Sequence, residues 1–218
     1  MSKLITPSLV SAVRWCQEAP NSHINHDPLM PTWREKAPQD LRNMLARDYT
    51  EPPGPALLLG IKFEDAVYKE CKAPTGKGTP LFQEFVAECV GGQFQRITKV
   101  VVEIDGVEYC CYGKIDAYFP TIIKDLKTTS KEHVDPEGYL KSFQHEMYCL
   151  NEHIDDFRYC IAVFDANQKI VDKVNVDWHC DDREALKAKA ISIIRETIAY
   201  IKVSDELFEL YNTKFSRY

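Results

Sequence analysis

The triplet Asp125-Leu126-Lys127 places an acid and a base two residues apart in the sequence. It lies in a stretch rich in β-branched residues, Ile122 to Thr128, that is typical of a strand. Because side chains alternate across a strand, Asp125 and Lys127 should share one face while Leu126 points into the core. A carboxylate and an ammonium group at one spot could hold a divalent cation and stabilise negative charge.

Asp116 supplies a second carboxylate near the end of the preceding predicted strand. A short turn around Pro120 separates it from Asp125, so a hairpin can bring the two carboxylates together. Side by side they repel each other, and a hard cation such as Mg²⁺ or Mn²⁺ would make the arrangement favourable. The alternative is a pair of solvent-facing charges on an edge hairpin.

Glu64 is an acid on an otherwise apolar stripe of a predicted helix. Burying a lone carboxylate is costly, so Glu64 should lie at the helix end of the stripe, pair with a base or bind a metal. A boundary glutamate that reaches solvent is the structural alternative. Its neighbours at helical spacing are Leu57, Gly60, Ile61, Val67, Tyr68 and Cys71.

Gln144 and Tyr148 share one face of another predicted helix with Leu140 and Met147. Both polar side chains need hydrogen-bond partners if they are buried. The alternative is an ordinary amphipathic helix with a boundary glutamine and a half-buried tyrosine.

Helices and strands interleave along the chain, which predicts an α/β fold with a central mixed sheet flanked by helices on both faces. Asp105-Gly106 is a strong hairpin signal, and Ser8 is the predicted N-cap of the first helix. The predicted strands are 96–104, 107–119, 122–128, 157–164 and 169–178. The predicted helices are 8–18, 39–47, 56–71, 81–90, 137–151, 182–202 and 205–213.

The length of 218 residues and the 44% hydrophobic content fit a single domain with one substantial core. We expect a helical segment over 1–55, a catalytic core over about 56–178 and C-terminal helices over about 182–213. No apolar run approaches the roughly 20 residues that span a bilayer, so we expect a soluble, cytoplasmic protein without a membrane partner.

The eight cysteines are scattered without a C-x-x-C pair, and we interpret them as reduced thiols. Cys110 and Cys111 are adjacent on a predicted strand, so they point to opposite faces and cannot chelate one metal together. The net charge of −6 argues against a protein that coats nucleic acid by charge alone. It is compatible with carboxylates gathered around a cation, because the metal supplies positive charge.

Four motifs taken in order resemble the PD-(D/E)XK nuclease superfamily, especially its RecB-like and phage-exonuclease-like branches. They are Gly60-x-x-x-Glu64, Gly113-x-x-Asp116, Asp125-x-Lys127 and Gln144-x-x-x-Tyr148. The segment Ile5-Thr-Pro-Ser8-Leu is also similar to the Ile-Thr-x-Ser opening of phage-type exonucleases. The resemblance extends from about residue 5 to residue 150.

The resemblance implies a restriction-endonuclease-like core and a metal site. Asp116, Asp125 and the Leu126 carbonyl would bind Mg²⁺ or Mn²⁺, Glu64 would be a further acidic ligand, and Lys127 would act on the attacking water. The residues implied to support the site or contact DNA are Gln144, Tyr148, Ser8, Thr128, Thr129 and Lys131. For Thr128, Thr129 and Lys131, solvated loop residues are the alternative.

The implied function is that of a metal-dependent DNA nuclease in recombination and repair, with an exonuclease favoured over an endonuclease. The implied partners are DNA, a single-strand annealing protein and further copies of the chain. The alternative is a catalytically silent DNA-binding or scaffolding member of the same fold, and a metal-free structural protein of unrelated fold is a second rival.

Three departures from the family pattern limit these expectations. Ile115 precedes Asp116 where the motif has proline, which changes little. Only Lys3 lies upstream of the Ile-Thr-x-Ser segment, where phage-type relatives carry an arginine for a 5′ phosphate. We expect no iron-sulfur cluster, because Cys16 could be a first ligand but only Cys180 lies near the C-terminus.

Overall fold

The computed structural model describes residues 2–48, 50, 52 and 54–216, and the chain divides into two compact units. The terminal unit contains Met1–Glu51, Lys99–Gly113 and Glu184–Tyr218. The central unit contains Pro52–Thr98 and Lys114–Arg183. That the chain is one domain with a core over about 56–178 stays a prediction.

Within the described residues, six strands form a mixed sheet in the order β1-β3-β4-β5-β6, with β2 paired to β3. β4 and β5 are parallel, whereas β3 with β4 and β5 with β6 are antiparallel. The α/β class with a central mixed sheet is therefore confirmed. The strands are β1 (Lys3–Ile5), β2 (Gln93–Ile104), β3 (Val107–Tyr118), β4 (Ile122–Thr129), β5 (Asp156–Phe164) and β6 (Ile170–His179).

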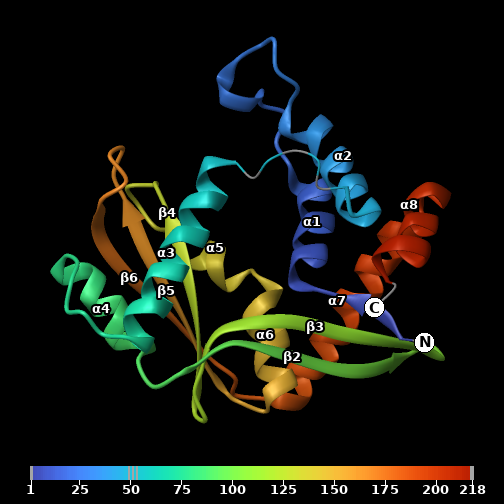
Figure 1. The fold of residues 1–218 in the computed structure, drawn as a ribbon. Helices are drawn as coiled ribbons and strands as arrows, with labels where there is room; N and C mark the ends of the chain where they lie inside the picture. Colours follow the sequence, from blue (N-terminus) through green and yellow to red (C-terminus); the bar gives the residue numbers. More distant parts are fainter. Residues whose placement is uncertain (1, 49, 51, 53, 217–218) are drawn as a thin grey trace. The chain divides into compact units, whose positions relative to one another are not determined.

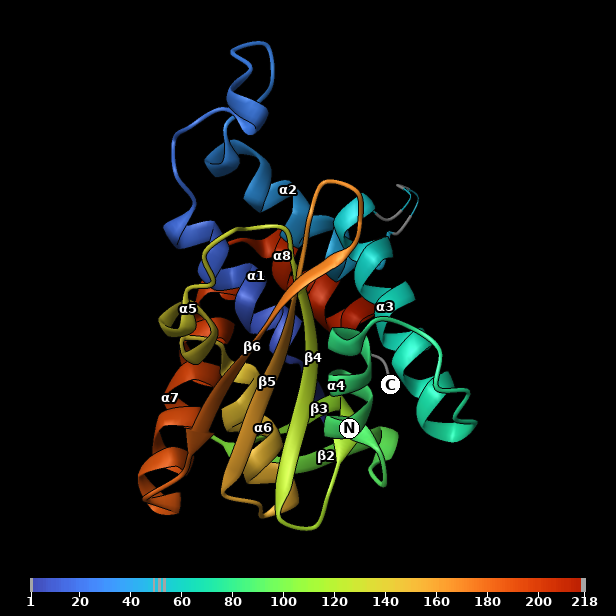
Figure 2. The same ribbon diagram turned by 90° about the vertical axis from the view of Figure 1, so that its left-hand side faces the viewer.

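In the central unit, helices cover both faces of the strands β4, β5 and β6, which lie side by side (Figure 2). On one face, α3 (Pro55–Lys72) and α4 (Pro80–Cys89) bury Phe63 and Phe85 against Leu126 and Cys160. The other face is covered by α6 (Phe143–Glu152), whose His145 ring lies 5.9 Å from the ring of Phe157. Leu126 faces α3 and α4, so its neighbours Asp125 and Lys127 face the α6 side, as strand alternation predicts.

The terminal unit packs helices against one another (Figure 1). The Arg42 guanidinium binds the Glu206 carboxylate at 2.6 Å, and the Tyr211 hydroxyl donates to the Leu4 carbonyl at 2.9 Å. The three-residue strand β1 was not predicted. The helices are α1 (Pro7–Glu18), α2 (Trp33–Ala46), α7 (Arg183–Lys202) and α8 (Asp205–Leu210), with a short 3-10 helix at Ile24–His26 and a π-helix at Tyr211–Phe215.

The prediction that Ser8 caps the first helix is wrong, because Thr6 is the N-cap. The Thr6 hydroxyl accepts a hydrogen bond from the Leu9 amide at 3.1 Å. Pro7 occupies the first helical position, where the missing N–H of proline would have no intrahelical partner. Ser8 lies in the first turn with its side chain exposed.

The second helix begins at Trp33, not at Gln39 as predicted. Thr32 and Glu35 form a capping box that starts it earlier. Pro38 lies inside the helix and removes one backbone hydrogen bond. The capping box and the burial of Leu41 offset that loss.

The predicted helix 137–151 is two helices, α5 (Pro136–Leu140) and α6, that are broken at Lys141 and Ser142. The Ser142 hydroxyl accepts a hydrogen bond from the Gln144 amide at 3.2 Å and so starts α6. Gln144 therefore lies in the first turn of α6. The other predicted elements are present and differ from the structure only at their ends.

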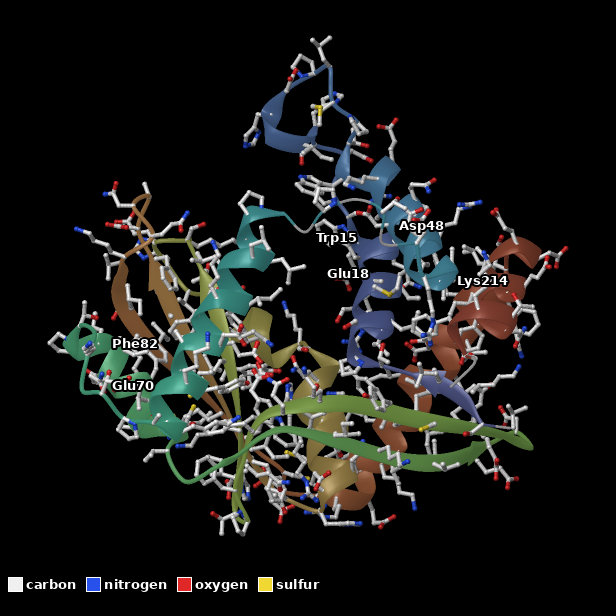
Figure 3. The ribbon with its side chains drawn as sticks, viewed as in Figure 1. Trp15, Glu18, Asp48, Glu70, Phe82 and Lys214 are labelled. Atoms are coloured by element: carbon white, nitrogen blue, oxygen red, sulfur yellow. The ribbon has the colours of Figure 1, made fainter. Side chains whose placement is uncertain are left out.

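Glu70 has a structural role at the end of α3 (Figure 3). Its Oε1 accepts hydrogen bonds from the amides of Thr75 and Gly76, both at 2.7 Å. Its Oε2 accepts a bond from the Thr75 hydroxyl at 2.8 Å. The triplet Glu70-Cys71-Lys72 also matches a D/E-x-K pattern, but it lies on a helix, where residues i and i+2 do not face each other.

All eight cysteines are free thiols in the structure. Cys110 and Cys111 are both buried. In the part of the chain that the structure describes, no helix is both long and apolar enough to cross a membrane.

Glu88 joins α4 to three strands of the central unit. Its carboxylate lies 2.6 Å from Lys124 of β4, 3.3 Å from Arg158 of β5 and 3.2 Å from Lys173 of β6. Burial alone would raise the pKa of Glu88, but hydrogen bonds from Lys124 and Lys173 lower it to about 2. The ionised form of Glu88 is therefore held firmly in the folded protein.

We predict that Glu88→Gln lowers the free energy of unfolding at neutral pH by on the order of 3 kcal/mol. A carboxylate with a depressed pKa stabilises the fold above its unfolded pKa and loses that effect as the pH falls. The difference between wild type and variant should therefore shrink from about pH 4.5 to about pH 2. Urea titrations at several pH values measure it. Glu84→Gln on the same helix is the control, because Glu84 is exposed. Equal stabilities of wild type and Glu88→Gln at neutral pH would contradict the prediction.

Candidate functional site

The structure brings Asp116 and Asp125 together on neighbouring strands. The pairing of β3 with β4 joins Ala117 to Lys124 beyond a turn in which the Phe119 amide donates to the Ile122 carbonyl at 3.0 Å. At Leu126, the backbone N–H donates to Asp116 Oδ2 at 2.9 Å. Asp125 is only 1% exposed and Asp116 only 9%, so both carboxylates are buried.

Burial raises the pKa of both carboxyl groups. The pKa of Asp116 is raised well above its ordinary value by burial and then by the charge of Asp125. The pKa of Asp125 is also raised by burial, and Lys127 opposes that shift. In the absence of a metal cation, Asp116 therefore holds a proton more readily than Asp125 does.

Lys127 lies beside Asp125, with its Nζ 2.5 Å from Asp125 Oδ2. The lysine side chain is 34% exposed, so one end faces the carboxylates while part of it reaches solvent. Burial lowers the pKa of Lys127, but the carboxylates of Asp125 and Asp116 outweigh burial and raise it. Lys127 is therefore a fixed positive charge at this spot.

Gln144 and Tyr148 connect α6 to the two carboxylate strands. The Gln144 amide donates to Asp125 Oδ1 at 2.5 Å, and the Tyr148 hydroxyl donates to the Lys114 carbonyl at 3.0 Å. A weaker contact of 3.5 Å joins the two side chains. Both polar side chains thus have partners, and Gln144 fixes one oxygen of Asp125.

Glu64 approaches the carboxylate pair from α3 and influences the pKa of both Asp116 and Asp125. The apolar stripe around Glu64 is divided, because Leu57 is 59% and Ile61 is 44% exposed. Glu64 itself is half-buried at this boundary. It is paired, although with polar neutral groups instead of a base.

The partners of Glu64 are Tyr68 and Gln95. The Tyr68 hydroxyl donates to Glu64 Oε1 at 2.7 Å, and the Gln95 amide binds the same oxygen. Gln95 has a φ of 55° within β2, in the left-handed region that costs a residue with a side chain about 1–3 kcal/mol. Sequence analysis missed Gln95, and no local signal could have found a contact across 31 residues.

Gly60 allows α3 to pass close to β4. A Cβ at this position would lie 3.3 Å from the Thr128 hydroxyl, which is tighter than an ordinary contact. The Gly60-x-x-x-Glu64 motif thus combines a close helix approach with a carboxylate one turn later on the same helix.

The remaining predicted residues are placed as follows. Thr129 accepts a hydrogen bond through its hydroxyl from the Lys131 amide at 3.1 Å, and both residues line a cavity beside Lys127. Ser8 belongs to the terminal unit, whereas all the other predicted site residues belong to the central unit.

Two cavities of the central unit contain site residues. The lysine-side cavity, of about 370 Å³, includes Lys127 in its wall. The glutamate-side cavity, of about 430 Å³, includes Glu64 in its wall, together with three lysines, Lys69, Lys72 and Lys114. A chain of phosphates could therefore meet positive charge on either side of the buried acids.

The donor atoms suit a hard divalent cation. Among the described residues, no three Asp, Glu, His or Cys side chains are arranged to hold an ion by themselves. Mg²⁺ is commonly bound through one or two carboxylates, with water and substrate phosphates completing the shell. The N–H and C=O groups of one strand residue point toward the same neighbouring strand. Because the Leu126 N–H donates to Asp116, the Leu126 carbonyl also points toward Asp116. Asp116, Asp125 and this carbonyl fit such a site.

Comparisons with known proteins establish the fold. No protein-family model matches the chain, and no curated protein matches its sequence. The crystal structure of the protein SSO0001 aligns with 91% of this chain and 76% of its own, at 15% identity and a TM-score of 0.52.

Two exonuclease structures align over most of their length at lower TM-scores. A phage-related exonuclease from Haemophilus somnus 129PT has 14% identity over 95% of this chain and 94% of its own, with a TM-score of 0.47. The alkaline exonuclease LHK-Exo from Laribacter hongkongensis has 14% identity over 95% and 91%, with a TM-score of 0.45. At these identities the chain shares a fold with a solved structure, and its chemistry must be inferred from its own residues.

We predict that Asp116→Asn stabilises the metal-free protein at neutral pH by about 1 kcal/mol, or roughly 2–4 °C in melting temperature. An asparagine can still accept the Leu126 amide and donate to Asp125, as protonated Asp116 does. Asp125→Asn should instead be destabilising, because it removes the ionic partner of Lys127. Thermal melts in EDTA compare the two variants, and a higher melting temperature for Asp125→Asn would show that we have misassigned the proton.

Proposed function

We propose that this chain is a divalent-metal-dependent nuclease that hydrolyses phosphodiester bonds in DNA. The observation that carries this proposal is the buried pair Asp116 and Asp125 with Lys127 beside it. Two buried acids and one lysine leave a deficit of positive charge that a metal ion would fill. The four motifs that resemble the PD-(D/E)XK superfamily support the same chemistry.

Asp116, Asp125 and the Leu126 carbonyl would hold the ion, with Glu64 as a further acidic ligand. Tyr68 and Gln95 both bind Oε1 of Glu64, so they orient its other oxygen, Oε2. When bound, the ion would lower the pKa of a water and neutralise charge on the scissile phosphate.

Lys127 would hold its proton at Nζ and stabilise the negative charge of the attacking water and the phosphoryl oxygens. Gln144 would keep Asp125 in a single orientation through the bond to Oδ1. Tyr148 would fix β3 against α6 through the Lys114 carbonyl. Gln144 and Tyr148 would therefore position the site without touching the reacting atoms.

The net charge of −6 requires that DNA be bound locally. Lys69, Lys72 and Lys114 of the glutamate-side cavity would contact backbone phosphates, and Thr128, Thr129 and Lys131 would contact the strand beyond Lys127. On the resemblance alone, we propose exonuclease action in recombination and repair, with an annealing protein and other copies of the chain as partners. Ser8 is proposed as a DNA contact on the same ground.

The proposal is tested with linear, nicked and closed circular DNA in Mg²⁺. Loss of the linear form alone would establish an exonuclease, and linearised circles would establish an endonuclease. If no form is cut while Mn²⁺ still binds in calorimetry, the chain is a catalytically silent member of the fold and the nuclease proposal is wrong.

We predict that Lys127→Ala lowers the cleavage rate by about 100-fold or more. Its affinity for Mn²⁺ should stay equal or increase, because Asp125 loses the cation that competes for its oxygen. Single-turnover cleavage and calorimetry measure the two quantities. Lys169→Ala, on the exposed turn between β5 and β6, is the charge-matched control. A Lys127→Ala enzyme as fast as this control would exclude Lys127 from the chemistry.

We predict that Glu64→Gln loses most cleavage activity and recovers part of it when Mg²⁺ is raised. A neutral amide is a poorer ligand for a hard cation, so the metal midpoint should move to higher concentration. Cleavage is measured across a Mg²⁺ titration, with the exposed Glu84→Gln as the control. An unchanged rate and an unchanged midpoint would remove Glu64 from the site.

A further inference from the structure

Apart from Lys127, the lining of the lysine-side cavity takes no part in the hydrolysis proposed above. Its wall runs from the end of β4, through the loop that follows, to α5 and β5. Lys127, Thr129 and Lys131 come from the β4 side, and Tyr139 comes from α5. The volume of about 370 Å³ lies in the range of small-ligand pockets.

An aromatic ring of this cavity packs against a buried ring. The Tyr139 ring packs against the Tyr159 ring, with centroids 5.5 Å apart and planes at 49°. Tyr159 is buried, and its hydroxyl lies 3.0 Å from His145 Nδ1. Tyr139 is only half-buried, and it lines the cavity. A ring supported from behind and open to a cavity is a suitable platform for stacking.

The cavity is continuous with the candidate active site. Lys127 belongs to both, and its Nζ lies 6.0 Å from the centre of the Tyr159 ring against which Tyr139 packs. Thr129 lies two residues beyond Lys127 on the same strand face, a displacement of roughly 7 Å. A group placed next to the scissile phosphate on this side would therefore enter the cavity.

The charged groups of the cavity suit a nucleotide. Lys131 adds a cation to Lys127, and His133 adds an imidazole. Asp135 is the acid among the described lining residues. Its carboxylate would repel a second phosphate, but it can accept hydrogen bonds from the N–H groups of a base. One phosphate and one base therefore match the lining better than several phosphates do.

We propose that the lysine-side cavity binds the nucleotide that adjoins the scissile phosphate, with its base stacked on Tyr139 and its phosphate held by Lys131 and Thr129. This inference rests on the proposed nuclease function. Stacking on a tyrosine tolerates every base, so the cavity would hold the strand in register without reading its sequence.

The stacking is tested with a single-stranded oligonucleotide that carries 2-aminopurine, titrated in Ca²⁺ without Mg²⁺. Tyr139→Phe should bind and quench the fluorophore as wild type does, because it keeps the ring. Tyr139→Ala should bind about 5- to 100-fold more weakly and quench less. Should Tyr139→Ala fail to fold, an oligonucleotide with one abasic position, scanned along the strand, tests the wild-type protein directly. Equal binding at every abasic position would overturn the proposal.

The phosphate contact is tested with Lys131→Ala against Lys169→Ala. The first should reduce the slope of log K against log salt by about 1, and the second should leave it unchanged. If inorganic phosphate competes with the oligonucleotide as strongly as a mononucleotide does, the cavity binds phosphate alone and the base-stacking proposal is wrong.

The two proposals fail in distinguishable ways. If wild type cuts DNA in Mg²⁺ but neither the Tyr139 variants nor the abasic scan alters binding, the cavity proposal is wrong and the nuclease proposal stands. If binding depends on the Tyr139 ring but no DNA is cut, the nuclease proposal is wrong and the cavity still binds nucleotides.

Discussion

Two carboxylates that share a buried position need compensating charge or hydrogen bonds, and this need governs the arrangement around Asp116 and Asp125. Burial raises the pKa of both groups, which shows that the folded protein holds them at a cost. Each nearby donor reduces that cost in part: Lys127 and the Gln144 amide bind Asp125, and the Leu126 N–H binds Asp116. These donors come from β4 and α6, so two elements are placed by the requirements of one acid pair.

The need to position these acids also explains three local irregularities of the backbone. The break at Ser142 starts α6 at the point where Gln144 can reach Asp125, and a continuous helix from residue 137 would lack this cap. Gly60 brings α3 close to β4, and Gln95 adopts a left-handed conformation while its amide binds Glu64. Such local departures from regular structure are expected where positioning matters more than stability.

Periodicity in the sequence predicted the parts of the site that depend on local structure. Strand alternation placed Asp125 and Lys127 on one face, and the Asp105-Gly106 signal marked a turn in which both residues have positive φ. It could not predict which hydroxyl caps a helix, since Thr6 and Ser8 are equally suitable by type. Nor could it predict Gln95 beside Glu64 or the cations around Glu88, because these contacts join residues far apart in the sequence.

Glu88 and Asp116 show how burial and partners together separate a structural acid from a candidate functional one. Both carboxylates lie in the central unit, and burial raises the pKa of each. Three cations lie around Glu88, and two of them, Lys124 and Lys173, outweigh burial and lower its pKa to about 2. Around Asp116, a neighbouring acid adds to burial, and Lys127 is bonded to Asp125. The first acid is compensated by cations of the fold, whereas the second keeps a proton more readily until a further cation is bound, and groups with pKa values raised in this way are where binding and catalysis are sought.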